Sequence, residues 1–223
     1  NNKKYDLIVV HGAGSFGHPI AEKFKLINGL DESPEQKNSI KEIRNQMKEL
    51  NKILCEIIES KGMKTKSIIP SESMKTRGAK HISQFPKEIF DQCLFEGNIP
   101  VTFGDATDDE IQGINILSGD VIMMELARIY KPTFSIFIMD YPGVMDGELN
   151  SKKSNLIPLV NSNMIDKFKQ KMKINNTTDV TGGLIGKLEC ALQISRYSQC
   201  WITDLDSLHM ALLGNPTGSK VIQ

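Results

Sequence analysis

Three glycines follow an apolar run near the start of the chain. Gly12, Gly14 and Gly17 spell G-x-G-x-x-G within the stretch VVHGAGSFGHP. Glycines let backbone N–H groups approach an anion closely, and a helix that follows directs its positive end toward the same place. Ser15 adds a hydroxyl group, and His18 adds an imidazole whose charge can change near neutral pH. The stretch is therefore a candidate site for a small phosphate.

The same spacing is also typical of dinucleotide sites, which need more than glycines. A dinucleotide-binding fold places an Asp or Glu at the end of a second strand about 20 residues further on. Here the corresponding segment, NGLDESPEQKNSIKEI, leads into a long helix, so no predicted strand carries Asp31, Glu32 or Glu35. Phosphate binding is favoured over NAD binding, and a tight turn without any ligand stays open as an alternative.

A second glycine stretch, DVTGGLIGK, covers residues 179–187. Its pair Gly182 and Gly183 can form another backbone cradle before a helix that carries Lys187. The spacing resembles a Walker A motif but is one residue too short between its glycines, and Leu188 stands where Ser or Thr would bind Mg²⁺. The lysine suits a transferring phosphoryl group as a point charge, although it could instead be a solvated helix residue.

The stretch ILSGD precedes a further predicted helix. Ser118 is expected to cap this helix, and Asp120 would lie in its first turn. Asp120 could complement the helix dipole, or it could orient catalytic lysines. Two anion cradles, one lysine and one aspartate together suggest transfer between two phosphates, a reaction that depends on positioning and charge neutralisation.

A cluster of acids lies just upstream, in the stretch TFGDATDDE. These side chains could be taken for a metal site, but the segment has the composition of a hairpin-like polar loop. We expect a solvated turn here, and we predict no metal-ligating residues. The acids are Asp105, Asp108, Asp109 and Glu110.

Strands and helices alternate along the chain and would position these stretches. Apolar runs predict strands at 5–10, 63–69, 99–103, 133–139, 199–203 and 219–222. Apolar residues spaced three and four apart predict helices at 19–26, 34–61, 86–96, 118–129, 162–171 and 184–197. This order indicates an α/β fold with a mostly parallel central sheet.

The composition limits the classes of function. The 223 residues carry a formal net charge of zero, which argues against the basic face that nucleic-acid binding needs. The apolar runs are too short to span a membrane. None of the four cysteines forms a C-x-x-C pair, so we expect buried, reduced thiols in a cytoplasmic protein.

Five of these stretches occur in an order that resembles a known family. HGAGSFGHP, FGDA, ILSGD, MDYPGV and DVTGGLIGK resemble the amino-acid kinase superfamily, and within it the isopentenyl phosphate kinase family. The match spans nearly the whole chain. It implies an open three-layer αβα sandwich formed by a single kinase domain over residues 1–223. Its N-terminal substrate lobe would cover about 1–130, and its C-terminal nucleotide lobe about 131–223.

The resemblance implies ATP-dependent phosphorylation of isopentenyl phosphate, a small isoprenoid monophosphate. The product would be isopentenyl diphosphate, in the alternative mevalonate route of isoprenoid biosynthesis, and the reaction would use Mg²⁺. The family is usually homodimeric, so the resemblance also implies a cytoplasmic homodimer. It implies no nucleic-acid or membrane partner.

The family's motifs assign roles to individual positions of this sequence. Lys187 would stabilise the transferring phosphoryl group, Asp120 would orient lysines, and His18 would bond the substrate phosphate. The other substrate-binding residues would be Ala13, Gly14, Ser15 and Gly119. The nucleotide would contact Gly14, Asp140, Tyr141, Gly143, Gly182, Gly183 and Lys187.

Two departures from the family pattern keep alternatives open. A K-x-G-G-S strand usually opens the family, but here Lys3 and Lys4 are followed by no glycine pair, so either an upstream segment is missing or the chain is not a competent kinase alone. The usual T-D-x-D-G-V reads MDYPGV, with Pro142 in place of the second acid. The alternatives are a kinase of another small phosphate or phosphonate, such as fosfomycin, and a non-catalytic nucleotide-binding module.

Overall fold

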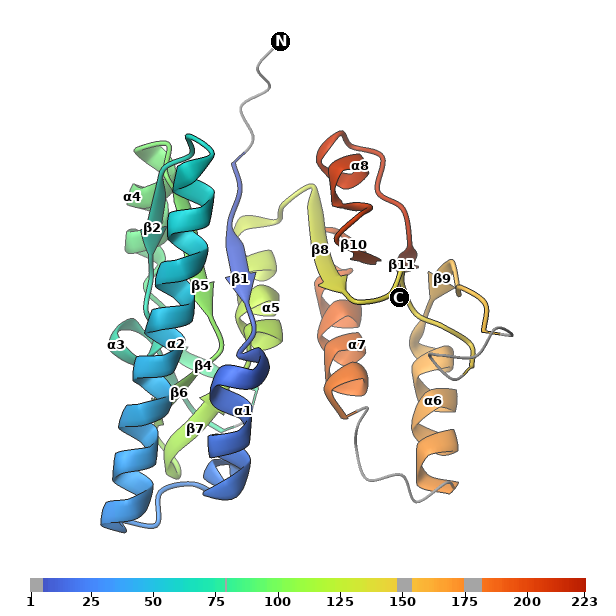
Figure 1. The fold of residues 1–223 in the computed structure, drawn as a ribbon. Helices are drawn as coiled ribbons and strands as arrows, with labels where there is room; N and C mark the ends of the chain where they lie inside the picture. The colour runs from blue at the N-terminus through green and yellow to red at the C-terminus, as the bar shows by residue number, and fades with distance from the viewer. Residues whose placement is uncertain (1–5, 79, 148–153, 175–181) are drawn as a thin grey trace. The chain divides into compact units, whose positions relative to one another are not determined.

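The chain folds into two compact units. A computed structural model describes residues 6–78, 80–147, 154–174 and 182–223. One unit ends at Ile122 and the other begins at Met123, within the helix α5 (Gly119–Tyr130). The lobe boundary predicted near residue 130 falls at the last residue of this helix, whereas the two units divide within it. Figure 1 shows a sheet in each unit, and each unit has its own apolar core.

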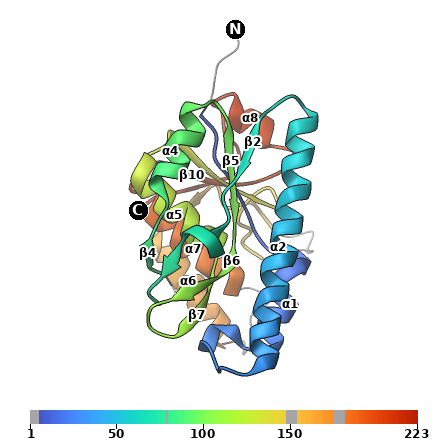
Figure 2. The same cartoon turned by 90° about the vertical axis from the view of Figure 1, so that its left-hand side faces the viewer.

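The first unit contains a parallel sheet that carries the glycine loop. Its strands lie in the order β1 (Val9–His11), β5 (Ile99–Phe103) and β2 (Thr65–Ser67). Figure 2 shows α2 (Pro34–Ser60) and α4 (Lys87–Phe95) on opposite sides of this sheet. The central strand β5 is buried from its second residue onward, as expected for a strand that is covered on both faces.

A second, four-stranded sheet completes this unit and was not predicted from the sequence. It contains a hairpin of β6 (Asp105–Asp109) and β7 (Gly113–Leu117). The short strand β3 (Lys75–Thr76) pairs with β6 and with β4 (Ile82–Gln84). The four-residue helix α3 (Pro70–Ser73) contacts β6.

The long helix α2 begins and ends close to where the sequence predicts. The Ser33 hydroxyl accepts a hydrogen bond from the Gln36 amide at 3.2 Å, and Pro34 occupies the first helical position, where its missing N–H costs nothing. Gly62, with φ of +82°, ends the helix. Apolar side chains spaced three and four apart bury one face of α2, including Ile40, Ile43 and Met47.

The helix α1 (Gly14–Lys23) starts earlier than expected. The prediction placed Pro19 in the first turn of a helix over residues 19–26, but Pro19 lies inside α1. Gly17 is buried against α2, with its Cβ position 3.4 Å from the Met47 sulfur and 3.6 Å from Ile43 Cγ2. This packing stabilises the helical turn before Pro19. His18 therefore lies on a helix, and not in the loop.

The second unit has a mixed sheet. The strands β8 (Phe134–Met139) and β10 (Gln199–Asp204) are parallel, and β11 (Ser219–Val221) runs antiparallel to β10 and parallel to β9 (Leu159–Val160). The helix α7 (Gly182–Ile194) contacts both β10 and the helix that precedes it. The remaining helices are α6 (Ser162–Ile174) and α8 (Leu208–Leu212). The core residues include Phe137, Val160, Leu188, Ile194 and Ile202.

The cysteines are as the sequence predicts. Cys55, Cys93, Cys190 and Cys200 are all buried thiols. Burial raises the pKa of Cys200 to about 12, so this thiol stays protonated at neutral pH. Across the described ranges, no helix combines the length and apolar character that crossing a bilayer would require.

Candidate functional site

The glycine loop forms an open backbone cradle between β1 and α1 (Figure 1). Gly14 has φ of +51°, a left-handed conformation that glycine adopts at little cost. A Cβ atom added at Gly12 or Gly14 would meet no atom within 4 Å, so the space beside both residues is open. Ala13 is the N-cap and has no side-chain oxygen with which to cap the first N–H groups of α1. The arrangement is suited to anion binding.

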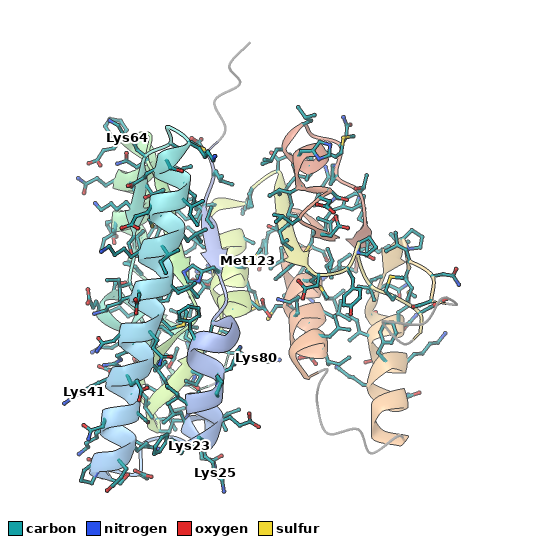
Figure 3. All side chains as sticks on the ribbon, viewed as in Figure 1. Lys23, Lys25, Lys41, Lys64, Lys80 and Met123 are labelled. Carbon is teal, nitrogen blue, oxygen red and sulfur yellow. The ribbon has the colours of Figure 1, made fainter. Side chains whose placement is uncertain are left out.

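The third glycine of the motif has a different role from the first two. Gly17 faces Met47 and Ile43 on α2, so it brings two helices together and does not line the open cradle. Of the residues that follow the loop, His18 is exposed on α1, and the side chain of Ser15 lies outside what the structure describes. Figure 3 shows Lys23 and Lys25 at the opposite end of this helix, where cations complement the dipole.

The segment after the loop confirms that the dinucleotide alternative is wrong. In the described chain between β1 and β2, the segments are helical or irregular, and no strand ends in an acid. Asp31 accepts hydrogen bonds from the Ser33 amide at 2.8 Å and the Ser33 hydroxyl at 2.6 Å. These bonds lower the pKa of Asp31 and fix the turn that enters α2.

The start of α5 lies beside the glycine loop. A Cβ atom at Gly119 would approach the His11 carbonyl oxygen at 3.3 Å and Val10 Cγ1 at 3.2 Å. The Gly104 amide donates a hydrogen bond of 3.1 Å to the same carbonyl of His11. The structure therefore brings Gly119 next to the end of β1, as a shared phosphate site would require.

The helix α5 begins as predicted. The Ser118 hydroxyl accepts a hydrogen bond from the Val121 amide at 3.3 Å, which confirms Ser118 as the N-terminal cap. Asp120 is half-buried in the first turn. The first unit thus holds Gly119 and Asp120 on one helix and the glycine loop on another element beside it.

The acidic stretch differs from the expected solvated turn. Asp105 and Asp109 lie in β6 with exposed fractions of only 2% and 7%. Asp105 accepts hydrogen bonds from the Ser71 amide at 3.0 Å and the Ala106 amide at 2.8 Å, although its burial still raises its pKa. Asp108 is exposed and pairs with Arg44 at 2.9 Å. Among the described residues, no cluster of three His, Cys, Asp or Glu side chains could hold a metal ion.

Backbone N–H groups explain why two carboxyl groups can be buried in β6. Asp109 accepts hydrogen bonds from Thr76 Oγ1 at 2.8 Å and the Gly78 amide at 2.7 Å. Its other oxygen accepts from the amides of Ile111 at 2.9 Å and Gln112 at 3.0 Å. Burial alone would raise the pKa of Asp109. The four hydrogen bonds outweigh this effect, so the pKa is lower than its ordinary value.

The second unit holds Lys187 near the carboxyl end of β8. The Lys187 ammonium nitrogen lies 4.9 Å from the centroid of the Phe137 ring, a cation–π contact. Gly183 is exposed at the start of α7, and a Cβ atom there would meet nothing within 4 Å. The preceding part of the expected second cradle, residues 175–181, lies outside the described residues.

The MDYPGV segment follows β8 directly. Asp140 is exposed and Tyr141 is half-buried, so both can be reached from solvent. Gly143 is buried with φ of +155°, and a Cβ atom there would lie 2.5 Å from Ser219 Oγ. Gly143 therefore permits a close approach to β11, and its role in the structure is one of packing.

Sequence reasoning missed a polar network that supports the glycine loop. His11, the last residue of β1, bonds Gly12 and Asn51, and Asn51 in turn bonds Ser67. One signal was available. Asn51 interrupts the apolar face of α2 between Met47 and Leu54, and a polar residue at such a position is usually bonded to a partner.

The predicted site residues fall into two sets, one in each unit. The first unit contains Ala13, Gly14, Ser15, His18, Gly119 and Asp120. The second unit contains Asp140, Tyr141, Gly143, Gly182, Gly183 and Lys187. In the first set, Gly14 and Gly119 each lie at the start of a helix that follows a strand, a common location for phosphate binding.

The fold, together with glycines at the starts of α1, α5 and α7, is typical of one class of protein. The model of the amino acid kinase family matches residues 1–204, and the chain belongs to this family. The α/β fold expected from the sequence is confirmed by this match and by the solved structures below.

Several relatives share one name. The isopentenyl phosphate kinase of Methanocaldococcus jannaschii is 30% identical over 226 residues, covering 99% of this chain and 82% of its own. That of Methanothermobacter thermautotrophicus is 29% identical, covering 84% and 71%. That of Arabidopsis thaliana is 33% identical over 62% of this chain and 42% of its own.

Solved structures show the same fold. A structure of isopentenyl phosphate kinase covers 97% of this chain and 84% of its own at a TM-score of 0.80 and 22% identity. The product complex of the Thermoplasma acidophilum isopentenyl phosphate kinase has a TM-score of 0.74 at 20% identity, covering 96% and 83%. Carbamate kinase from Giardia lamblia reaches 0.59 at 12% identity, covering 98% and 84%.

Proposed function

We propose that this protein transfers the γ-phosphoryl group of ATP to isopentenyl phosphate and forms isopentenyl diphosphate and ADP. The observation that carries the proposal is the open cradle at Gly12–Gly14, which has Gly119 beside it and an exposed histidine on the helix that follows. Relatives named isopentenyl phosphate kinase, one of them 30% identical over nearly the whole chain, support the choice of acceptor.

In this proposal the first unit holds the acceptor. The backbone N–H groups at the start of α1 donate hydrogen bonds to the monophosphate, and His18 adds a bond from its imidazole. A phosphate oxygen of the acceptor attacks the γ-phosphorus, the bond from that phosphorus to the bridging oxygen breaks, and ADP leaves. Holding the acceptor in one orientation contributes much of the rate because the reaction needs little covalent help.

The second unit supplies the nucleotide site and its positive charge. Lys187 neutralises charge on the transferring phosphoryl group, and the N-terminus of α7 at Gly182 and Gly183 receives the nucleotide phosphates. Asp140 and Tyr141 are accessible for contacts with the ribose or base. The family resemblance assigns Asp120 the role of orienting lysine side chains.

A magnesium ion would arrive with ATP. Mg²⁺ is usually held through one or two carboxylates together with substrate phosphates, and it retains several waters. When bound, the ion would neutralise charge on the nucleotide phosphates.

The family resemblance further supports a cytoplasmic homodimer. Sedimentation of the purified protein would test whether it is a dimer.

A panel of acceptors in a coupled ADP assay tests the activity. We expect ADP formation with isopentenyl phosphate and little with fosfomycin or simple alkyl phosphonates. Efficient turnover of fosfomycin without turnover of isopentenyl phosphate would assign the protein to another phosphate kinase. ATP binding without turnover of any acceptor would favour a nucleotide-binding module.

Substitution of His18 tests its role as an acceptor ligand. His18→Ala should raise the KM for isopentenyl phosphate about tenfold, because one hydrogen bond to a charged group is lost, while the KM for ATP changes little. His81→Ala is the control, since His81 is an exposed histidine of the same unit on a different segment, just before β4. Unchanged kinetics in His18→Ala would remove this histidine from the site.

A further inference from the structure

His11 occupies a fixed position directly before the phosphate cradle. Its ring stacks on Phe103 of β5, with the centroids 5.1 Å apart and an interplanar angle of 26°. Its carbonyl oxygen accepts the hydrogen bond from the Gly104 amide. Both contacts come from the neighbouring strand and the residue after it, so the orientation of the imidazole is set by the sheet.

The hydrogen bonds around this imidazole define its tautomer. Ser67 Oγ donates to Asn51 Oδ1, and the Cys55 thiol approaches the same oxygen at 3.8 Å. The Asn51 amide nitrogen then faces His11 Nε2 at 3.2 Å. An amide nitrogen only donates, so Nε2 must accept, and the ring proton must be on Nδ1.

The proton on Nδ1 reaches the glycine loop. His11 Nδ1 lies 2.9 Å from the Gly12 carbonyl oxygen and donates to it. Burial lowers the pKa of His11, which keeps the ring neutral and Nε2 free to accept. The Gly12 carbonyl oxygen can only accept, so Nδ1 must carry the proton, and a neutral ring then leaves Nε2 to accept from the Asn51 amide.

The geometry of the peptide bond transmits this contact to the cradle. In a trans peptide the C=O and the following N–H point in opposite directions. A Gly12 carbonyl that is held against the imidazole therefore turns the Ala13 N–H away from the ring. The Cβ positions of Gly12 and Gly14 show that space beside the loop is open.

We propose that His11 is a positioning residue of the cradle, whose Nδ1–H holds the Gly12 carbonyl and thereby aims the Ala13 N–H at the acceptor phosphate. This inference rests on the proposed function for the identity of the acceptor only. Any phosphate that binds the cradle would depend on the same contact. His11 itself does not touch the substrate.

Two substitutions of His11 distinguish the roles of its two ring nitrogens. The side-chain amide nitrogen of an asparagine occupies about the position of Nδ1 and can donate, whereas the amide oxygen of a glutamine can reach about the position of Nε2 and accept. His11→Asn can therefore keep the bond to Gly12, and His11→Gln can keep only the bond to Asn51. We expect the KM for isopentenyl phosphate to rise less than about threefold in His11→Asn and about tenfold in His11→Gln, with the KM for ATP unchanged in both. His81→Gln is the matched control.

Calorimetric titration with inorganic phosphate separates this inference from the proposed activity. Phosphate binding that weakens in His11→Gln and persists in His11→Asn supports the inference even if the wild-type protein does not phosphorylate isopentenyl phosphate. Normal turnover together with wild-type KM values and phosphate affinity in both variants would overturn the inference and leave the activity in place. Failure of the wild-type protein to bind phosphate would overturn it as well.

A measurement on the wild-type protein avoids any effect of substitution on folding. Nitrogen-15 NMR of the imidazoles distinguishes a protonated from an unprotonated ring nitrogen. We expect His11 to carry its proton on Nδ1 at neutral pH. A proton on Nε2 would contradict the hydrogen-bond chain and with it the proposed role.

Discussion

Lys187 is positioned by an aromatic side chain as well as by its helix. Phe137 is buried in the core of the second unit, and its ring lies beneath the lysine ammonium group. A cation over an aromatic face is stabilised by the charge distribution of the ring. The family resemblance implies that the positive charge of Lys187 acts on a phosphoryl group.

Replacement of this lysine should affect the chemical step. Lys187→Ala should lower turnover by about 10²–10³, since it removes a positive charge that stabilises the transition state. Lys220→Ala is a matched control, because Lys220 also lies over an aromatic ring, that of Trp201, at 5.6 Å. Steady-state ADP release measures both variants. Near-normal turnover in Lys187→Ala would exclude the residue from the mechanism.

Gly17 determines how closely α1 can lie on α2. Its Cβ position is in ordinary van der Waals contact with Ala13, Met47 and Ile43, so a methyl group fits but a longer side chain does not. Gly17→Ala should change the free energy of unfolding by less than about 1 kcal/mol, because the better helix propensity of alanine offsets tighter packing. Gly17→Leu should destabilise by about 1–3 kcal/mol through overpacking.

Urea unfolding of the two variants tests this packing. Equal stability of Gly17→Leu and the wild-type protein would mean that α1 does not pack closely on α2 in solution. Because α1 carries His18, we also expect Gly17→Leu to raise the KM for the acceptor, and Gly17→Ala to leave it nearly unchanged.

Asp109 connects the β6–β7 hairpin to β3. Its four hydrogen-bond partners belong to residues before and after it in the chain, and three of them are backbone amides. Asp109→Ala should lower the free energy of unfolding by about 2–3 kcal/mol, because these donors lose a buried acceptor. Asp108→Ala removes only an exposed ion pair with Arg44 and should cost less than about 1 kcal/mol.

The pKa of Asp109 predicts the pH dependence of this contribution. The pKa is lower in the folded chain than the ordinary value of 3.8. The unfolded chain therefore binds the proton first as the pH falls, and stability falls with it. The contribution of ionised Asp109 to the free energy of unfolding is complete above pH 3.8. It is lost as the pH falls through the lowered pKa of the folded chain. Acid unfolding of the wild-type and Asp109→Ala proteins measures the difference between their free energies of unfolding, and this difference should become smaller at low pH. A constant difference would contradict this assignment.

Much of the molecule could be predicted from periodicity. The strand over 99–103 matches β5, and the helices over 34–61 and 118–129 differ from α2 and α5 by a residue or so at either end. These elements are long or buried, so their patterns are strong. The glycine loop and its following helix were also expected, although α1 begins at Gly14 because α2 packs against Gly17.

The parts that escaped prediction depend on contacts distant in sequence. DATDD in β6 reads as a polar loop, and its burial depends in part on the amides of Ser71 and Gly78, which belong to other segments of the chain. The role of His11 likewise depends on Asn51 and Ser67, which belong to a helix and a strand further along the chain. Neither set of partners is visible in a local window of sequence.

Ligand binding should stabilise the protein as a whole. Isopentenyl phosphate and a non-hydrolysable ATP analogue should each raise the melting temperature, since a ligand at 100 times its Kd contributes about 2.7 kcal/mol. Both ligands together should raise it further. Thermal denaturation of wild-type and Lys187→Ala proteins tests this, and the variant should retain the shift with isopentenyl phosphate. No shift with either ligand would contradict the proposed pair of sites.

The pairing of β1 has a consequence for biosynthesis. The described part of the sheet places β1 at an edge, where it pairs only with β5, and in the chain β5 follows α2, the small strands and α4. At the usual speed of translation the ribosome needs on the order of ten seconds to produce that intervening polypeptide. Until then β1 has no partner strand in the nascent chain, so the position of His11 is not fixed. The capacity to hold phosphate must therefore emerge late, when most of the first unit has already left the exit tunnel.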